Sequence, residues 1–251
     1  MKKVRLEEYN QHSFEEAGID KVILAIGSCE SHGAHLPFGC DTFVSHQIGL
    51  DLAERLEKTV VAPPLWFGMS QHYRHQPMCL SLSDDTVIKV VSEILDSLAF
   101  WGINKVLIIN GHDGNIAPIE IAARDFKVKN PDFCLAVLDA WWVTAGALLP
   151  ENTFEVWNGL GHGGEGETSI GLSIFPELCD MDRAQGQLPE MDDKVKLIWN
   201  FAELTKFGAS GDPTKATAEK GDKMRSVLVD YLVEFMNKMD KQGWRYKVKD
   251  I

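Results

Sequence analysis

Four carboxylate and imidazole side chains that could bind a metal ion lie within residues 27–41, whose sequence is GSCESHGAHLPFGCD. They are Glu30, His32, His35 and Asp41. Carboxylates and imidazoles are hard-to-borderline ligands that suit Zn, Mn or Fe(II), and a carboxylate can bridge two ions. A single histidine is more often a hydrogen-bonded structural group. The prediction of a metal site therefore rests on the cluster rather than on any one member.

A second cluster, NGHDGN at residues 110–115, contains His112. Both clusters lie at the ends of apolar runs, KVILAI for the first and KVLIIN for the second, which are typical of buried strands. In an open parallel sheet, the loops that leave the carboxyl ends of the strands lie on one rim. Glu30, His32, Asp41 and His112 are therefore expected to converge. Burying such groups without a cation would cost several kcal/mol each, which favours metal binding.

The elements that must position these clusters are strands and amphipathic helices that alternate along the chain. Strands are predicted at residues 22–26, 59–62, 105–110 and 133–138, and helices at residues 84–101 and 224–239. Ser83 is expected to cap the first helix and Gly102 to end it. The apolar stripes are Val87, Val91, Ile94, Leu98 and Trp101 in the first helix, and Val227, Leu228, Tyr231, Leu232 and Phe235 in the second. The alternation predicts an α/β fold, a mainly parallel sheet sandwiched between helices, in a single domain over residues 1–251.

A loop-rich region is predicted at residues 140–166, and long loops inside compact domains tend to be functional. A third cluster, GHGGEGETS at residues 161–169, supplies His162, Glu165 and Glu167 just before an apolar segment that reads as a helix. The start of a helix favours carboxylates, so these two glutamates alone indicate only first-turn helix acids.

Composition restricts the class of partner. The formal net charge of −12 argues against nucleic acid, because polyanion binding relies on clustered lysine and arginine. The five cysteines are odd in number and form no CxxC pair, which fits a reducing cytoplasm. Cys29 and Cys40 flank the first cluster and could be ligands, but small buried thiols are the more common case. No uncharged run approaches the ~20 residues of a membrane span, so a membrane partner is not expected.

The three clusters, with a later segment GASGDPTKATAEKG at residues 208–221, resemble the creatininase (creatinine amidohydrolase) family. They occur in the family's order over residues 21–221. The first cluster is the most specific, because it fixes Glu30, His32, His35, Pro37 and Asp41 at once. The resemblance implies a parallel α/β domain that assembles as a homohexamer, binds two divalent ions per subunit (Zn, Mn or Fe) and acts on a small-molecule substrate.

The resemblance also implies a role for each ligand. Glu30 and His112 would bind one ion, His32 would bind the other, and Asp41 would bridge them. In creatininase the remaining ligand is an acid two residues beyond the histidine of the NGH motif, where this chain has Gly114. Glu167 is then the expected ligand, and Glu165 is the alternative.

Catalytic and substrate-binding residues are predicted from general chemistry once two ions are assumed. A water held between two such ions is acidified, and one ion can polarise a substrate carbonyl. His162, which is not needed as a ligand, is predicted to carry the proton to the leaving nitrogen. Trp141, Trp157 and His72 are predicted to bind the substrate. Core packing or a subunit contact would suit the tryptophans equally well, and a solvated loop is the alternative for His72.

Two features depart from the family pattern. Asp113 stands where relatives commonly have glycine, and it is expected either to orient the imidazole of His112 or to be a surface acid on a turn. Residues 68–83, GMSQHYRHQPMCLSLS, differ from the usual FPGT-like stretch. The expected activity is hydrolysis of a C–N bond in a small cyclic amide or formamide. The alternatives are C–C cleavage of an oxidised inositol on the same metal site, and a non-catalytic oligomer stabilised by metal.

Overall fold

A parallel four-stranded sheet forms the centre of the fold. The computed structural model describes residues 2–192, 194–195 and 197–249. The strands are β1 (Lys21–Ile26), β2 (Thr59–Val61), β3 (Lys105–Asn110) and β4 (Cys134–Leu138), in the order β2-β1-β3-β4. β1 and β3 pair from Lys21 with Lys105 to Ile26 with Asn110, so both strands end on the same rim. The predicted strands and fold class are confirmed, with ends that shift by one residue at β1, β2 and β4.

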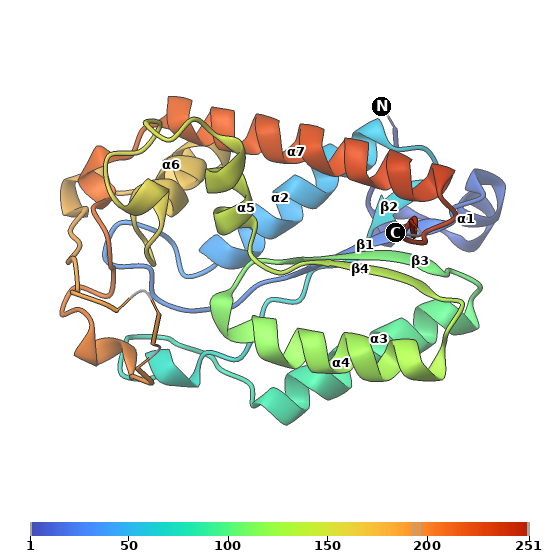
Figure 1. Ribbon diagram of the computed structural model, residues 1–251, viewed down its shortest axis with the longest axis horizontal. Helices are drawn as coiled ribbons and strands as arrows, with labels where there is room; N and C mark the ends of the chain where they lie inside the picture. Colours follow the sequence, from blue (N-terminus) through green and yellow to red (C-terminus); the bar gives the residue numbers. More distant parts are fainter. Residues whose placement is uncertain (1, 193, 196, 250–251) are drawn as a thin grey trace.

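Helices cover both faces of the sheet. The α-helices of the described chain are α1 (Gln11–Ala17), α2 (Cys40–Arg55), α3 (Asp84–Phe100), α4 (Ile116–Lys129), α5 (Trp141–Leu148), α6 (Glu165–Ile174) and α7 (Ala218–Lys241). The short 3-10 helices are η1 (Leu6–Glu8), η2 (Gln71–Tyr73), η3 (Asp113–Asn115), η4 (Trp157–Gly159), η5 (Pro176–Leu178), η6 (Met181–Arg183), η7 (Phe201–Glu203) and η8 (Pro213–Lys215). In Figure 1, α2, α5 and α7 lie on one face, and α3 and α4 lie on the other.

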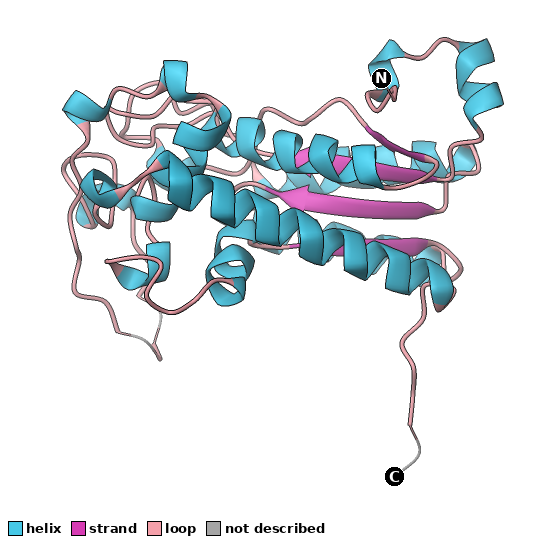
Figure 2. Ribbon diagram, turned by 90° about the horizontal axis from the view of Figure 1, so that it is seen from above, coloured by secondary structure: helices cyan, strands magenta, loops and turns pink. Residues whose placement is uncertain are grey.

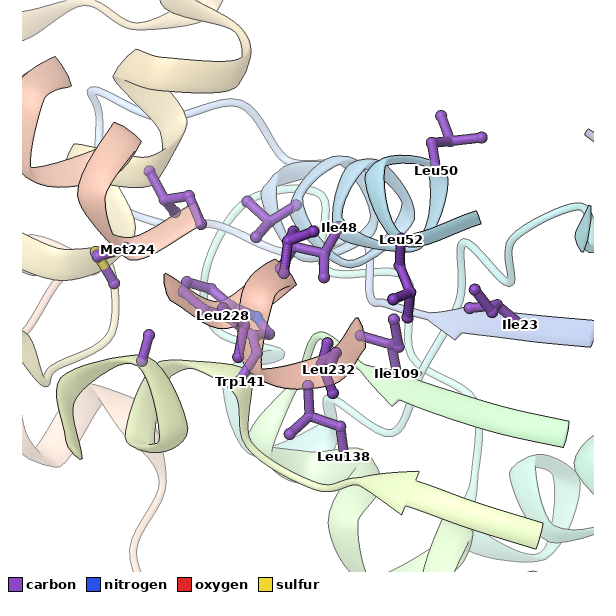
Figure 3. Close-up of a cluster of buried hydrophobic side chains, with 14 of the residues drawn as sticks. Ile23, Ile48, Leu50, Leu52, Ile109, Leu138, Trp141, Met224, Leu228 and Leu232 are labelled. Atoms are coloured by element: carbon purple, nitrogen blue, oxygen red, sulfur yellow. The ribbon is translucent and has the colours of Figure 1, made fainter. Parts of the chain in front are cut away.

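Successive side chains of β1 feed two separate apolar cores, because side chains alternate across a strand. Ile23 belongs to the core that Ile48 of α2 and Leu228 of α7 help to form on one face (Figure 3). Val22 and Leu24 join the core that α3 and α4 complete on the other face. A strand that is apolar on both sides is what a sheet covered by two helical layers requires.

The two predicted helices are confirmed, but one residue of each predicted apolar stripe is exposed. Ser83 caps α3 by accepting a hydrogen bond from the Thr86 N–H, and Gly102 follows in the left-handed region with φ of 80°. Trp101 lies just past the last turn and is 77% exposed, because the helical period no longer applies there. In α7, which is longer than predicted, Tyr231 also faces outward, with 44% of its surface exposed.

The prediction of a long loop at residues 140–166 is wrong in its first third. α5 occupies Trp141–Leu148, and α6 begins at Glu165. The sequence of α5, WWVTAGAL, has apolar residues almost all round, so it gives no helical period to detect.

Loops and short helices gather at one end of the molecule, and the strand arrows in Figure 2 point toward that end. This is the rim on which the two sequence clusters were expected to meet. No helix of the described chain is long and apolar enough to cross a membrane.

Candidate metal centre

Two close backbone contacts position the ligands, one within the loop after β1 and one between the end of β3 and the start of α2. The loop after β1 is closed by the Glu30 N–H, which donates to the carbonyl of Phe38 at 3.0 Å, and it leads into α2, where Asp41 lies in the first turn. Gly111 follows β3, and a Cβ there would lie 2.2 Å from the carbonyl oxygen of Asp41. Because only a glycine allows that approach, the end of β3 reaches the first turn of α2 and brings His112 beside Asp41.

Glu30, Asp41 and His112 form the first ligand group, and all three are buried. Nδ1 of His112 lies 3.2 Å from Oε1 of Glu30 and 3.3 Å from Oδ2 of Asp41. The other ring nitrogen, Nε2, lies 3.0 Å from the carbonyl oxygen of Met69. A carbonyl oxygen can only accept, so Nε2 carries the hydrogen and the Nδ1 lone pair of a neutral ring faces the two carboxylates.

His32, Asp41 and Glu167 form the second ligand group. Nε2 of His32 lies 2.8 Å from Oδ1 of Asp41 and 3.9 Å from Oε2 of Glu167. Glu167 reaches the group from the first turn of α6, where its Oε2 also accepts the N–H of Gly163 at 2.6 Å. The two oxygens of Asp41 therefore face different groups, the geometry that a bridging carboxylate requires.

The donor set fits a cation. Within the described residues, Oε1 of Glu30 and Oδ2 of Asp41 are buried without a hydrogen-bond partner. A buried carboxylate oxygen without a donor costs free energy, and a divalent ion is the simplest group that would satisfy both oxygens and the lone pair of His112. Carboxylate and imidazole are the ligand types that zinc, manganese and iron accept.

The ionisation of these groups reflects the concentration of buried carboxylates. Burial opposes protonation of His32, yet the carboxylate of Asp41, with smaller effects from Glu167 and Glu30, raises the pKa of His32 to about 10. Burial also opposes protonation of His112, but the carboxylates of Glu30 and Asp41 raise the pKa of this imidazole well above its ordinary value. Burial raises the pKa of Glu167 to about 7, although His32 partly counters this. In the absence of an ion, the imidazoles supply the positive charge that the carboxylates need.

His162 lies beside both ligand groups. Its ring stacks on that of His32, with 4.2 Å between centroids. Its Nε2 lies 2.6 Å from the carbonyl oxygen of Ser31 and so carries the hydrogen, while Nδ1 lies 3.8 Å from Oε1 of Glu30. Nδ1 therefore has a free lone pair directed at the site. Glu30, His32 and His162 form a third potential ligand group, with ligand atoms within 4.8 Å of one another.

A cavity of about 790 Å³ opens onto the site. Five of the predicted site residues line it, namely Asp41, His112, Trp157, His162 and Glu167. Its aromatic wall consists of Tyr73, Trp142, Trp157, Trp199 and Phe201. Such a cavity is large enough for a small organic molecule and places it against the ligand groups.

Two of the predicted substrate-binding residues are not among the described residues that line the cavity. Trp141 is 1% exposed and packs in the core between α2 and α7, so the prediction that it contacts substrate is wrong (Figure 3). Neighbouring residues on a helix point about 100° apart, and its neighbour Trp142 lines the cavity instead. His72 is not among the described residues that line the cavity, and its ring lies 5.7 Å from that of Trp199. Trp157 does line the cavity, and its contact with a substrate stays a prediction.

Three further expectations concern side chains next to the ligands. Glu165, the alternative ligand, accepts the N–H groups of Glu155 and Val156 and belongs to none of the ligand groups of the described chain. Asp113 is exposed on the cavity wall, and the carbonyl of Met69 holds the position beside His112 that was predicted for it. Cys40 is a buried core thiol, the commoner of the two alternatives for the cysteines.

Several side chains pack around the ligands in roles that the sequence did not predict. The ring of Tyr73 lies 4.5 Å from that of His162, and Phe201 packs on the same imidazole at 4.7 Å. Ser70 contacts Nε2 of His112 at 3.1 Å and hydrogen-bonds Ser28, which donates to Oε2 of Glu30. An alternation of apolar residues cannot reveal such contacts, because they come from irregular segments.

The model of the creatinine amidohydrolase (creatininase) family matches residues 7–236. The chain is 30% identical to the creatinine amidohydrolase of Pseudomonas putida, over 87% of this chain and 89% of that protein. It is 27% identical to the mycofactocin precursor peptide peptidase of Mycobacterium ulcerans, over 83% of this chain and 81% of that protein. It is 29% identical to the 3-dehydro-scyllo-inosose hydrolase of Thermotoga maritima, over 85% of this chain and 75% of that protein.

Solved creatininase structures share the fold. A crystal structure of creatinine amidohydrolase has a TM-score of 0.83 at 25% identity, covering 95% of this chain and 98% of that one. A manganese form of creatininase has a TM-score of 0.80 at 27% identity, covering 94% and 98%. A zinc–zinc form of a creatininase variant has a TM-score of 0.82 at 25% identity, covering 95% and 98%.

The parallel α/β fold and the buried ligand groups on its carboxyl rim, together with relatives that are all hydrolases, define a metal-dependent hydrolase. The chain belongs to the creatininase family.

Proposed function

We propose that this chain is a dinuclear amidohydrolase that cleaves a C–N bond of a small cyclic amide or formamide. The observation that carries the proposal is the placement of Asp41, whose two carboxylate oxygens face two different ligand groups. Glu30 and His112 would hold one ion, His32 and Glu167 the other, and Asp41 would join them. Zn, Mn and Fe(II) all suit this donor set.

Paired divalent ions supply an acidified water and a polarised carbonyl when they are bound. The chain itself supplies the proton transfer. His162 offers the Nδ1 lone pair toward the site, and its Nε2–H is committed to the carbonyl of Ser31. Nδ1 can therefore accept a proton from the attacking water and return it to the leaving nitrogen as the C–N bond breaks. Tyr73 and Phe201 pack on the ring and hold it in that orientation.

The cavity wall favours a flat substrate that is neutral or positively charged. Trp142, Trp157 and Trp199 present aromatic faces, on which a planar ring can stack. Asp113, Glu190 and Asp192 add carboxylates to the wall, and none of the lining residues in the described part of the chain is a lysine or arginine. A phosphorylated substrate would find no cation there apart from the proposed ions.

The first test is metal analysis of gently purified protein combined with a substrate panel. We expect about two ions per chain, and we expect chelation to abolish hydrolysis of a cyclic amide or formamide. Protein that binds one ion or none after reconstitution with Zn²⁺ and Mn²⁺ would overturn the dinuclear assignment.

A second candidate is C–C cleavage of an oxidised inositol, supported by the 29% identity to the inosose hydrolase of Thermotoga maritima. Tryptophan faces suit a flat ring and a sugar-like ring alike, so the substrate decides between the two activities. The same panel decides between them if it contains creatinine, a formamidopyrimidine and an oxidised cyclic polyol.

The non-catalytic alternative predicts a closed ligand set, as in structural zinc sites. Here Asp41, His112 and Glu167 line an open cavity, which supports catalysis instead. We further propose a homohexamer in the cytoplasm, a prediction that light scattering on the purified protein and fractionation of cells will test.

A further inference from the structure

Glu165 is a fully buried carboxylate that the metal centre does not use. Its Oε2 accepts the backbone N–H of Glu155 at 2.9 Å and that of Val156 at 3.0 Å. Its Oε1 accepts a hydrogen bond from Nζ of Lys220 on α7 at 2.5 Å. Lys220 is itself held at the carbonyl of Lys215, 2.9 Å away. One side chain of α6 thus joins α7 to the backbone that runs into η4.

The segment that Glu165 holds carries a cavity residue in an uncommon backbone conformation. Trp157, Asn158 and Gly159 follow one another with φ of 47°, 53° and 79°. A non-glycine residue in the left-handed region is strained and persists only where its surroundings fix it. Trp157, the first of these residues, lines the cavity directly after the anchored Val156.

The opposite side of the same turn is also fixed. The side chain of Asn158 donates to the carbonyl of Gly146 on α5 at 3.1 Å. α6 approaches so closely that a Cβ on Gly166 would lie 2.5 Å from the carbonyl oxygen of Gly159. The backbone around Trp157 is therefore held between α5 and the first turn of α6, and on its N-terminal side Glu165 accepts the N–H groups of Glu155 and Val156.

We propose that Glu165 is a positioning residue that, with Lys220, holds the indole of Trp157 in the wall of the substrate cavity. Only a carboxylate can accept all three donors at once while neutralising the ammonium group. The first turn of α6 then divides its two acids between two tasks. Glu167 faces the ligand groups, and Glu165 faces the substrate wall. The effect on turnover rests on the proposed function, whereas the effect on the loop does not.

Hydrogen exchange followed by mass spectrometry tests the anchor without any substrate. In Glu165→Gln protein, the peptides that cover residues 149–161 should exchange roughly tenfold to hundredfold faster, since bonds to a charged acceptor are lost. Metal content after reconstitution with Zn²⁺ should equal that of the wild type. Glu155→Gln is the matched control, because that side chain is exposed and lies 3.6 Å from Lys220. It should leave exchange unchanged.

Kinetics provide the second readout. Glu165→Gln should raise KM with little change in kcat, because a displaced Trp157 weakens substrate binding rather than the chemical step. If Glu165→Gln does not fold, Lys220→Met is measured in its place, and it should show the same local increase in exchange. Unchanged exchange over residues 149–161 in the folded variant would overturn the anchor. Faster exchange in a protein that hydrolyses no amide would support the anchor and count against the proposed function.

Discussion

Gly111 is the position where a single methyl group should disrupt the first ligand group. A Cβ there would lie 2.2 Å from the carbonyl oxygen of Asp41, whereas ordinary contact begins at 3.4 Å. The end of β3 and the start of α2 would have to separate by 3.4 − 2.2 = 1.2 Å. Metal sites tolerate only about 0.2 Å of deviation in ligand distance, so His112 and Asp41 could no longer serve the same ion.

We expect Gly111→Ala to lower the free energy of unfolding by about 1–3 kcal/mol, the usual cost of overpacking. We also expect it to weaken binding of one ion by at least roughly tenfold, as misplaced ligands do. Calorimetric titration of the metal-free protein with Zn²⁺ or Mn²⁺ measures the affinity, and thermal unfolding measures the stability.

Gly102→Ala is the control for this experiment. Gly102 lies at the opposite end of the sheet, before β3, and a Cβ there meets nothing within 4 Å. Its φ of 80° still makes alanine unfavourable, so stability should fall while both ions bind normally. The reasoning is refuted if Gly111→Ala binds two ions as tightly as the wild type does.

Three other predictions concern the proton carrier, the second ligand group and the far end of the sheet. His162→Ala should keep its ions but lose roughly 10²–10⁴ in kcat, and an unchanged rate would remove His162 from the mechanism. Glu167→Gln should bind one ion fewer by elemental analysis, and full occupancy would count against Glu167 as a ligand. Asp20 and Asp240 each lie 3.1 Å from Nζ of Lys21. Burial raises the pKa of both acids. Hydrogen bonds from nearby donors and the charges of the lysines lower it by more, so the pKa of each acid lies below its ordinary value. The contribution of these two acids to the free energy of unfolding is therefore present above about pH 4 and is lost as the pH falls through the lowered pKa values. On acidification, the Tm of the Asp20→Asn protein should fall less steeply than that of the wild type. Parallel plots of Tm against pH for the two proteins would contradict this prediction.

The sheet and the convergence of the clusters could be predicted because they depend on local and topological rules. KVILAI and KVLIIN are apolar on both sides, which only a doubly covered strand requires. Parallel pairing then places residues after β1 and β3 on one rim, whatever their separation in the chain. Glu30, Asp41 and His112 meet there for that reason.

The choice between neighbouring residues could not be made from the sequence. Glu165 and Glu167 share the first turn of α6 but are about 200° apart around the helix, so only packing decides which one faces the ligands. The same holds for Trp141 and Trp142 on α5, since an apolar helix has no polar face to fix its rotation. Trp199 lies in an irregular segment, where no period relates position to burial.

Gly114 lies against the backbone of segment 68–83, so the two regions are expected to evolve together. A Cβ at this position would lie 2.1 Å from the carbonyl oxygen of Met69 and 2.6 Å from Nε2 of His112. No larger residue can be accepted there while the backbone at Met69 keeps its course. An ancestor or descendant with an acid at this position must therefore carry a rerouted segment 68–83 as well. Substitutions in the two regions are expected to be inherited as a pair, and a chimera that exchanges only one of them should fold poorly.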